Sequence, residues 1–429
     1  MPNNDKTPKR FSGLAKEERE KFQQLLLALA FKYSQQADDM IDDIMRDQLE
    51  KEKEKKQMER KELLADPDNF LNKSPRQIKE AIDEYMIGQE EAKKILAVAF
   101  FNHIRRINAH DIAKEMDETK DLGIAKTSVI VAGPTGTGKS YLVEQLGKLF
   151  DIPVYVGDAS AVTQAGFIGK NAGDFVEQLY MKSGKNKEAT ERGIIFIDEI
   201  DKIAKSKEGK QNSMAEGAQQ SLLKIIEGTE VMIESSEPGD RSKMVIDTSN
   251  IMFVFAGAFV GLVGEDGRGK KTIGFMNEEV KSETHVEESQ RLMPVDFIKY
   301  GIIPEFMGRV SMIARMQQLT EQDLVDILTK TRNNIIDQYR NMLSSDQIKL
   351  VFPEETYRMI ASKAMELNTG ARSLKSIVDH LMVDKIFEIE TMGENKTEEI
   401  VVEVEYVEKK LKNFNKLQEE TNEDTPVQA

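Results

Sequence analysis

A glycine-rich segment, Gly133–Ser140, constrains the fold more than any other stretch of this chain. It matches the pattern Gly-x4-Gly-Lys-Ser/Thr without a mismatch. Apolar residues precede it and recur behind it at helical spacing, which predicts a strand, a tight loop and a helix. The glycines let the loop backbone turn its N–H groups toward a phosphate, and the helix N-terminus adds the positive end of its dipole. A plain glycine-rich turn after a strand is the alternative.

The residues of this segment have distinct expected roles. Lys139 would reach the β- and γ-phosphates of a nucleotide, and the Ser140 hydroxyl would hold Mg²⁺. The backbone before them would surround the phosphates, through Gly133, Pro134, Thr135, Gly136, Thr137 and Gly138. The segment therefore predicts a nucleoside triphosphate bound together with Mg²⁺.

Composition excludes several classes of function. The net charge of −15 and the pI near 5.1 argue against broad binding of nucleic acid. The chain has no cysteine and four scattered histidines, so we expect neither a disulfide nor a zinc site. There is no apolar run of about 18 residues, as a membrane span requires, and no signal-peptide profile at the N-terminus. We expect a cytoplasmic protein with no membrane contact.

The alternation of apolar runs with helical segments predicts the fold class. Expected strands include 153–156, 193–197 and 251–255, expected helices include 174–181 and 216–227, and 231–233 with 244–246 should form a hairpin. The run at 193–197 is continuously apolar, as in a parallel strand that is buried on both faces. We therefore predict an α/β P-loop NTPase domain, a parallel sheet with helices on both faces and the nucleotide at the carboxyl ends of its strands.

The flanking regions divide the chain into four expected parts. These are a helical N-terminal segment (1–65), the large domain (66–317), a small α+β domain (318–412) and a disordered acidic tail (413–429). Within them we expect a helix capped by Ser74, a polar connection over 107–126, a helix capped by Thr320 and a strand over 398–407. Apolar residues recur at helical spacing over 14–49, so this segment is expected to pack on the chain, pair with a copy of itself or bind a partner.

An acidic pair, Asp198 and Glu199, ends the buried strand that follows the phosphate loop in the same predicted sheet. Asp198 would hold Mg²⁺, directly or through water, and Glu199 would polarise the water that attacks the γ-phosphate. A solvated pair of carboxylates at a strand end is the alternative.

With these residues in place, the chain resembles the AAA+ ATPases and, more narrowly, the ClpX family of unfoldase subunits. The likeness runs from about residue 70 to 410. It is carried by the phosphate loop and by six further motifs in the same order, which are 85–94, 166–169, 197–203, 219–228, 303–309 and 369–372.

The resemblance implies roles for residues outside the loop. Met86 and Ile87 would line the adenine pocket, although they also fit an ordinary core. Arg309 matches the arginine finger that enters a neighbouring subunit's site, which implies a homo-oligomeric ring, by analogy a hexamer. Arg372 matches the arginine that senses the γ-phosphate, and an ordinary ion pair at a helix start is its alternative.

The resemblance also implies two loops that contact proteins. Gly166, Phe167, Ile168 and Gly169 match the aromatic pore loop that grips an unfolded or tagged substrate chain. Ile273, Gly274 and Phe275 match the loop that docks on a ClpP-like peptidase. The alternative for each of these two loops is that it packs against its own domain.

The chain departs from the family where the family contacts substrates. It lacks the N-terminal four-cysteine zinc domain, it has a shorter loop at 237–244, Gln211 replaces an arginine, and 170–173 replaces an acidic segment. These differences predict the same motor with different substrates, and adaptors that would act through the N-terminal helices.

The function predicted is ATP-dependent protein unfolding and translocation by a ring that delivers substrates to a ClpP-like peptidase. The chain itself shows no peptidase triad or metal pair. A stand-alone remodelling chaperone without a peptidase is the first alternative. A nucleotide-binding assembly scaffold with little turnover is the second.

Overall fold

The computed structural model describes residues 21, 72–115, 124–162, 172–205, 212–234, 243–262, 291–345, 347–387, 389 and 398–412. The chain divides into two units, Met1–Asn72 and Lys73–Ala429, and the helices and strands named below belong to the second. The expected N-terminal helices, the acidic tail, the pore loop and the peptidase-docking loop all lie outside the described residues.

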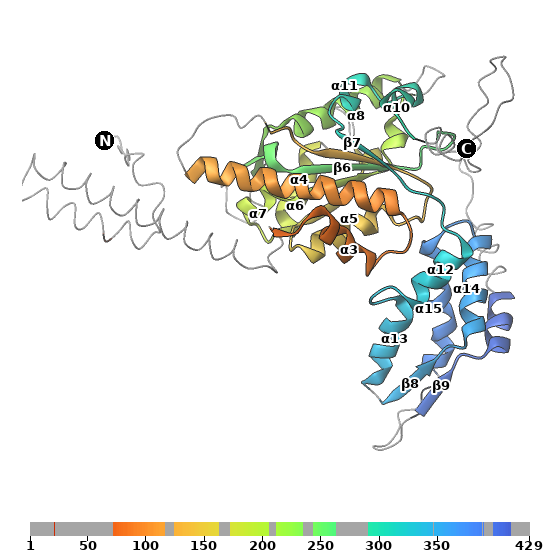
Figure 1. The fold of residues 1–429 in the computed structure, drawn as a ribbon. Coiled ribbons are helices and arrows are strands. Elements are labelled where there is room, and N and C mark those ends of the chain that lie inside the picture. The colour runs from red at the N-terminus through yellow and green to blue at the C-terminus, as the bar shows by residue number, and fades with distance from the viewer. Residues whose placement is uncertain are drawn as a thin grey trace, which may run out of the picture. The chain divides into compact units, whose positions relative to one another are not determined.

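A five-stranded sheet is the centre of the fold, with strand order β2-β3-β6-β1-β7 (Figure 1). Every neighbouring pair is parallel. Its strands are β1 (Ser128–Ala132), β2 (Val154–Asp158), β3 (Ile194–Asp198), β6 (Met252–Gly257) and β7 (Met312–Arg315). The predicted fold class is confirmed. The three inner strands read as continuous apolar runs because both faces of the sheet are covered.

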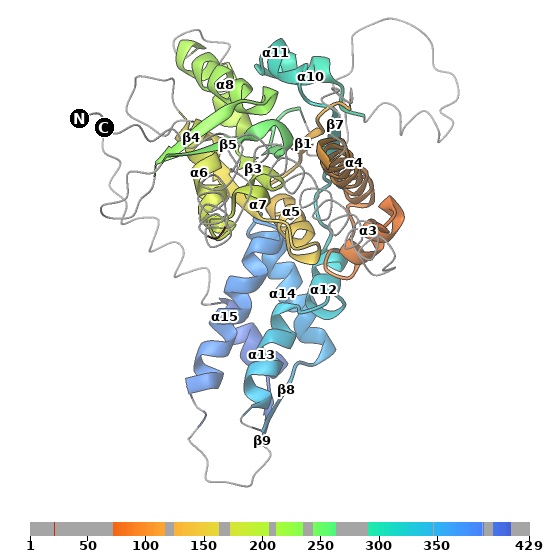
Figure 2. The ribbon, with the colours of Figure 1, turned by 90° about the vertical axis from the view of Figure 1, so that its left-hand side faces the viewer.

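Helices cover both faces of the sheet. One face carries α4 (Glu90–Glu115) and α5 (Lys139–Leu149), which are joined by a contact between the rings of Phe100 and Phe150 at 5.0 Å. The other carries α6 (Ala172–Lys182) and α8 (Asn212–Glu227), whose apolar side chains pack with Ile195, Ile197 and Phe255 in one core. Figure 2 shows α6 and α8 on one side of the strands and α4 on the other.

Shorter elements complete this part of the molecule. They are α7 (Lys187–Glu191), α10 (Pro294–Tyr300), α11 (Pro304–Met307), three 3-10 turns (Ala159–Ala161, Ile200–Ile203 and Thr248–Asn250), and the strands β4 (Glu230–Glu234) and β5 (Lys243–Asp247). β4 and β5 pair antiparallel, which confirms the predicted hairpin. The sequence did not predict β7, because this edge strand has only four residues and one fully buried position.

The elements before the sheet partly differ from the prediction. Ser74 caps α3 (Pro75–Asp83) through a capping box with Gln77, as expected. However, α4 continues to Glu115, so the polar connection predicted over 107–126 is wrong in its first half. The helix persists because Ile107 is still buried and the Arg106 side chain bonds the carbonyl oxygens of Ile124 and Ser249. No helix in the described ranges, α4 included, is long and apolar enough to cross a membrane.

A second core lies between Leu319 and Leu411, and we call residues 319–411 the helical part. It contains α12 (Glu321–Thr329), α13 (Ile335–Ser344), α14 (Glu354–Glu366), α15 (Ala371–Phe387), and the parallel pair β8 (Ile348–Val351) and β9 (Glu398–Val401). Thr320 caps α12 as predicted. The strand predicted over 398–407 is too long, because residues 404–412 are helical. Val407 and Leu411 lie one helical turn apart and are both buried in this core.

Candidate nucleotide-binding site

A cavity of about 370 Å³ opens where the carboxyl end of the sheet meets the helical part. The sheet side contributes Gly136, Thr137, Gly138, Lys139, Ser140 and Asp198, together with Tyr85, Met86, Ile87 and Tyr141. The helical part contributes Leu319, Ile327, Thr331, Asn333, Asn334, Ile335, Gln338, Ala371, Arg372, Leu374 and Lys375. Residues that are far apart in the sequence therefore line one space.

The phosphate loop has the backbone geometry that the pattern predicted. Gly136 and Gly138 adopt positive φ angles of 78° and 92°, which a side chain would disfavour. Gly138 precedes the first turn of α5, so the helix N-terminus faces the cavity. Lys139 is 8% exposed, and its Nζ donates to the carbonyl oxygens of Gly133 and Pro134 at 2.8 and 2.9 Å. Burial lowers the pKa of Lys139, while the charges of Asp198 and Asp201 oppose this shift.

The helical part touches the phosphate loop through backbone atoms. Ala371 N donates to Gly136 O at 3.0 Å, at the start of α15. Gly370 has a φ of 57°, and a Cβ there would lie 2.7 Å from Gly136 O, so this close approach requires glycine. The contact brings Arg372 to the cavity, where its positive charge contributes to the lowered pKa of Lys139.

Carboxylates gather at the ends of β2 and β3. Asp158 and Asp198 are direct neighbours in the pairing of these strands. Glu199 follows in the left-handed region with a φ of 57°, and it forms an ion pair with Lys202. Such strain in a non-glycine residue is typical of functional sites. Burial alone would raise the pKa of Asp158, but hydrogen bonds with Ser160 and Glu199 outweigh burial and lower it.

Ser140 and Asp198 fit a magnesium ion because a hydroxyl and a carboxylate oxygen line the same cavity. Among the described residues no group of three or more histidine, cysteine or acidic side chains could hold a metal by itself. This donor set suits Mg²⁺, which keeps several waters and takes its remaining ligands from the substrate's phosphates.

Met86 and Ile87 line the same cavity, and Met86 lies beside the phosphate loop, since a Cβ at Gly138 would lie 3.0 Å from Met86 Cε. The apolar side chains of Ile327, Leu319 and Ile335 line it from the helical part. An apolar slot next to a phosphate site suits a planar base. Apart from Arg372, sequence reasoning missed the residues that the helical part contributes, and it also missed Tyr141. Helical periodicity marks Ile327 and Ile335 as core residues and gives no sign of what they face.

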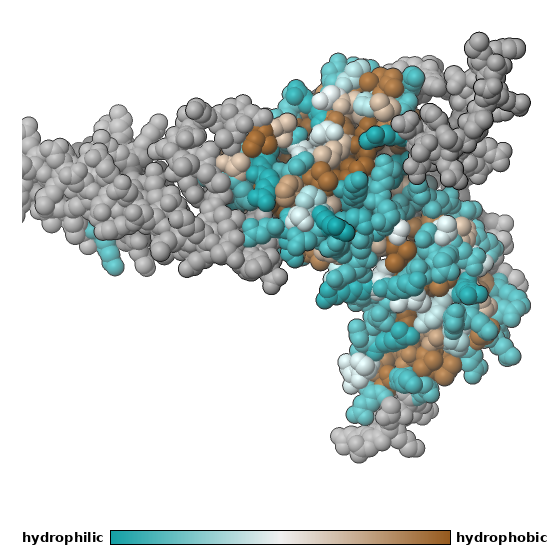
Figure 3. Space-filling view, in the orientation of Figure 1, coloured by the Kyte–Doolittle hydropathy of each residue, from teal (hydrophilic) through white to brown (hydrophobic). Residues whose placement is uncertain are grey.

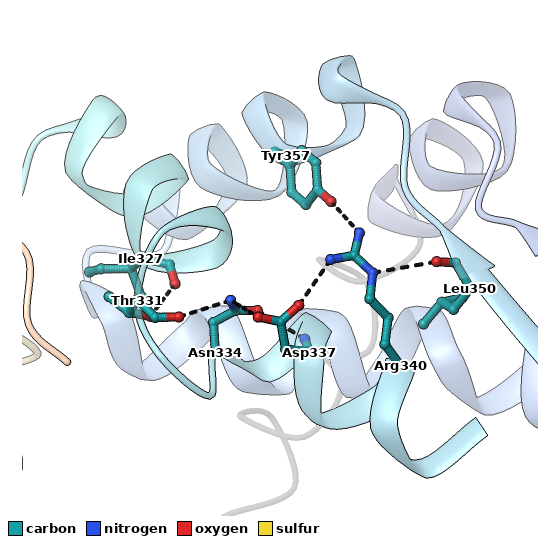
Figure 4. A network of polar contacts seen from close by, with 7 residues as sticks. All are labelled: Ile327, Thr331, Asn334, Asp337, Arg340, Leu350 and Tyr357. Carbon is teal, nitrogen blue, oxygen red and sulfur yellow. Dashed lines mark hydrogen bonds and ion pairs between the residues drawn. The ribbon is translucent and has the colours of Figure 1, made fainter. Parts of the chain in front are cut away.

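The turn between α12 and α13, residues 330–334, forms one wall of the cavity and is held by polar contacts (Figure 4). Asn334 Nδ2 donates to Thr331 O at 3.0 Å and to Asp337 Oδ2 at 2.7 Å. Asp337 Oδ1 accepts from Arg340, whose guanidinium also donates to the Tyr357 hydroxyl. The network anchors the turn to α14 through Tyr357, and to β8 through the hydrogen bond from Arg340 Nε to Leu350 O.

Arg309 does not line this cavity. Its side chain is 54% exposed, and Nη2 lies 2.6 Å from Glu227 Oε1 at the end of α8. The backbone carbonyl oxygen of Arg309 accepts a hydrogen bond from Ser128 Oγ, which fixes Arg309 beside the start of β1. Arg309, which was predicted to be an arginine finger, therefore lies on the surface and is paired with Glu227.

Comparison with known proteins agrees with this geometry. The model of the AAA domain (Cdc48 subfamily) matches residues 124–313, and that of the C-terminal, D2-small domain of ClpB protein matches residues 319–404. A parallel sheet, a phosphate loop and a helical C-terminal part thus define an AAA+ ATPase, and such an enzyme binds ATP with Mg²⁺.

Curated relatives narrow the class further. The chain is 38% identical over 325 residues to the ATP-dependent Clp protease ATP-binding subunit ClpX of Treponema denticola, covering 73% of this chain and 77% of the relative. It is 35% identical over 339 residues to ClpX 3 of Methylococcus capsulatus, covering 75% and 77%. The chain belongs to the ClpX family.

Proposed function

We propose that this protein is an ATP-driven unfoldase and translocase that works as a ring. The observation that carries the proposal is the division of the ATPase residues between two places. Residues 136–140 of the phosphate loop line one cavity together with Asp198 and Arg372, whereas Gly133, Pro134 and Thr135 do not line it and Arg309 is exposed on the surface. An exposed arginine suits a site that is completed between subunits. The proposed large domain (66–317) and small domain (318–412) would move relative to each other around the nucleotide.

Each site residue has a proposed role in hydrolysis. Lys139 would leave its loop carbonyls for the β- and γ-phosphates, and Met86 and Ile87 would contact adenine. Glu199 would polarise the attacking water and accept its proton. The water oxygen would bond to the γ-phosphorus while the bond from that phosphorus to the bridging oxygen of the β-phosphate breaks, giving ADP and phosphate. Bound magnesium would neutralise charge on the phosphates, with Ser140 and Asp198 as protein ligands. Arg372, and Arg309 of a neighbouring subunit, would stabilise charge in the transition state.

Protein contacts complete the proposal. The aromatic pore loop, Gly166–Gly169, would pull an extended chain through the ring by van der Waals contact. The loop with Ile273, Gly274 and Phe275 would dock on a ClpP-like peptidase. The names of the relatives, which describe ATP-binding subunits of a Clp protease, support a peptidase partner.

Degradation of a tagged, fluorescent folded protein tests the peptidase link. We expect fluorescence loss that requires ATP, and degradation to peptides only when the organism's ClpP-like ring is present. Phe275→Ala should abolish degradation and leave ATP turnover intact. Unfolding with no effect of the peptidase, and no association between the two rings, would favour the stand-alone chaperone. The presence of Glu199, Arg309 and Arg372 together favours turnover over a passive scaffold.

A further inference from the structure

We infer that Arg332 is a positioning residue for nucleotide binding. It joins the turn between α12 and α13 to the segment Glu84–Gln89, which carries the proposed adenine contacts. The inference rests on the proposed function, because it requires a nucleotide in the cavity. Arg332 does not itself line the cavity, and it acts through Tyr85, which does.

Arg332 holds the first end of this segment by three contacts. Its backbone N–H donates to Glu84 O at 2.7 Å. Its Nη1 donates to Glu84 Oε2 at 2.9 Å. Its guanidinium carbon lies 5.7 Å from the centroid of the Tyr85 ring, within the range of a cation–π contact. The backbone N–H of Arg332 thus fixes the backbone of the segment, and its guanidinium contacts the side chains of Glu84 and Tyr85.

Gln89 holds the second end. Its Nε2 donates to Gln317 O at 2.7 Å, and its Oε1 accepts from Gln317 N at 2.8 Å. Gln317 lies in the connection between β7 and α12, just before the helical part, so this pair fixes the second end of the segment to that connection. Tyr85, Met86 and Ile87 lie between the two fixed ends, and all three line the cavity.

The turn that carries Arg332 is itself rigid. Asn333 has a φ of 57°, and its carbonyl oxygen accepts from Gln338 Nε2 at 2.8 Å. The Asn334 and Asp337 contacts of Figure 4 fix the following residues. A displacement of the helical part is therefore transmitted to Glu84 and Tyr85 as long as the Arg332 contacts are intact. Without these contacts, the wall formed by Tyr85, Met86 and Ile87, where adenine is proposed to bind, can move.

The contact between Arg332 and Glu84 lies where it can break and re-form as the helical part moves. Glu84 and Arg332 have side chains that are 56% and 66% exposed, and the surface over α3 is hydrophilic (Figure 3). Water and salt screen an exposed ion pair, so it contributes little stability and breaks readily when the parts move. A second cavity of about 360 Å³, lined by Tyr85, Tyr141 and Arg332 among others, leaves space beside the contact for such movement.

Dissociation of fluorescent mant-ADP from the full-length protein tests the inference. Arg332→Gln should release mant-ADP about five- to tenfold faster, because it loses one ion pair and one cation–π contact. KM for ATP should rise by a similar factor while kcat stays within about twofold, because no transition-state contact is lost. Arg358→Gln removes the same charge from an exposed ion pair on α14 and should change neither value.

A pair of substitutions separates the specific contact from general destabilisation. Glu84→Gln loses only the ion pair, so it should speed release by a smaller factor than Arg332→Gln, which also loses the contact with Tyr85. The double variant should be no worse than Arg332→Gln alone, since both lose the same two contacts. The exchange Glu84→Arg with Arg332→Glu should restore slow release in part. Release by Arg332→Gln at the wild-type rate, or fully additive effects, would overturn the inference and leave the proposed function standing. Failure of the wild-type protein to bind mant-ADP would overturn both.

Discussion

Lys139 shows how a single residue prepares the site. Its ammonium group is buried against two loop carbonyls, so its charge already lies where phosphates would arrive. We expect Lys139→Ala to weaken ATP binding about 10- to 100-fold, the effect of losing a charged hydrogen bond. Equilibrium titration with mant-ATP measures this. Lys148→Ala, on the exposed side of the same helix, is the matched control, and equal losses in both variants would argue against a specific role for Lys139.

His103 makes the stability of the sheet depend on pH. It lies on α4, fully buried, with Nε2 3.0 Å from Arg192 O. Burial lowers the pKa of His103 to about 4, from 6.5. Its stabilising contribution is therefore complete above pH 6.5 and is lost as the pH falls toward 4, because only the unfolded chain binds the proton over this range.

The lowered pKa of His103 corresponds to about 3 kcal/mol of unfolding free energy. We expect urea denaturation of the wild-type protein to show a steeper loss of stability between pH 7 and 4.5 than that of His103→Gln, which does not titrate. Parallel pH profiles for the two proteins would contradict the assignment, whatever their difference in stability at pH 7.

Residues with a local signature were predictable from the sequence. The phosphate loop and the pair Asp198 and Glu199 carry patterns that place them at strand ends, and the structure brings Asp198 to the cavity with Lys139 and Ser140. Glu84 and Arg332 carry no such pattern. Their contact depends on how two separate cores pack, and no spacing within one segment records that.

At the scale of elements, the contact between the phosphate loop and α15 is the feature most open to test. Gly370→Ala would place a methyl group 2.7 Å from Gly136 O and add the cost of a positive φ, about 1–2 kcal/mol. We expect α15 to move, taking Arg372 with it, and ATP turnover to fall at least about tenfold, since transition-state charge would lose a donor.

Gly184→Ala is the control for this substitution. Gly184 has a φ of 70° and no atom within 4 Å of an added Cβ, so it adds backbone strain without a clash. Steady-state ATPase assays on both variants, with their thermal midpoints, measure the difference. A similar fall in turnover for both would mean that strain alone accounts for the loss.

Element boundaries were the least predictable part of the fold. α4 runs past the predicted end at Arg106 because Ile107 is still buried, although the surrounding sequence is polar. The alternation over 398–407 predicted one strand, but β9 stops at Val401 and the chain continues as a helix that packs Val407 and Leu411. In both cases, burial against the rest of the fold determined the secondary structure, and the local sequence pattern did not.

At the scale of the whole molecule, the exposed Arg309 predicts catalysis between subunits. Arg309→Ala should lower ATP turnover by about 10³-fold or more, by analogy with arginines supplied from a partner. Mixing Arg309→Ala with Glu199→Gln subunits should restore activity, because some sites then combine an intact Glu199 with a neighbour's intact Arg309.

The mixed-subunit ATPase assay has a defined expected value. When equal amounts of the two variants assemble at random, about a quarter of the sites contain both an intact Glu199 and a neighbour's intact Arg309. Activity should therefore approach about a quarter of the wild-type rate. A mixture that is no more active than its separate components, under conditions where subunits exchange, would place Arg309 outside the neighbour's site.

The central claim is that hydrolysis at Glu199 drives protein unfolding. The most direct measurement is the rate at which a tagged, fluorescent folded protein loses its fluorescence, with saturating ATP and no peptidase. We predict continuous loss with the wild-type protein, and loss at least about 100-fold slower with Glu199→Gln, which lacks the general base but still binds ATP. Wild-type unfolding by Glu199→Gln, or no ATP-dependent unfolding by the wild-type protein, would contradict the account.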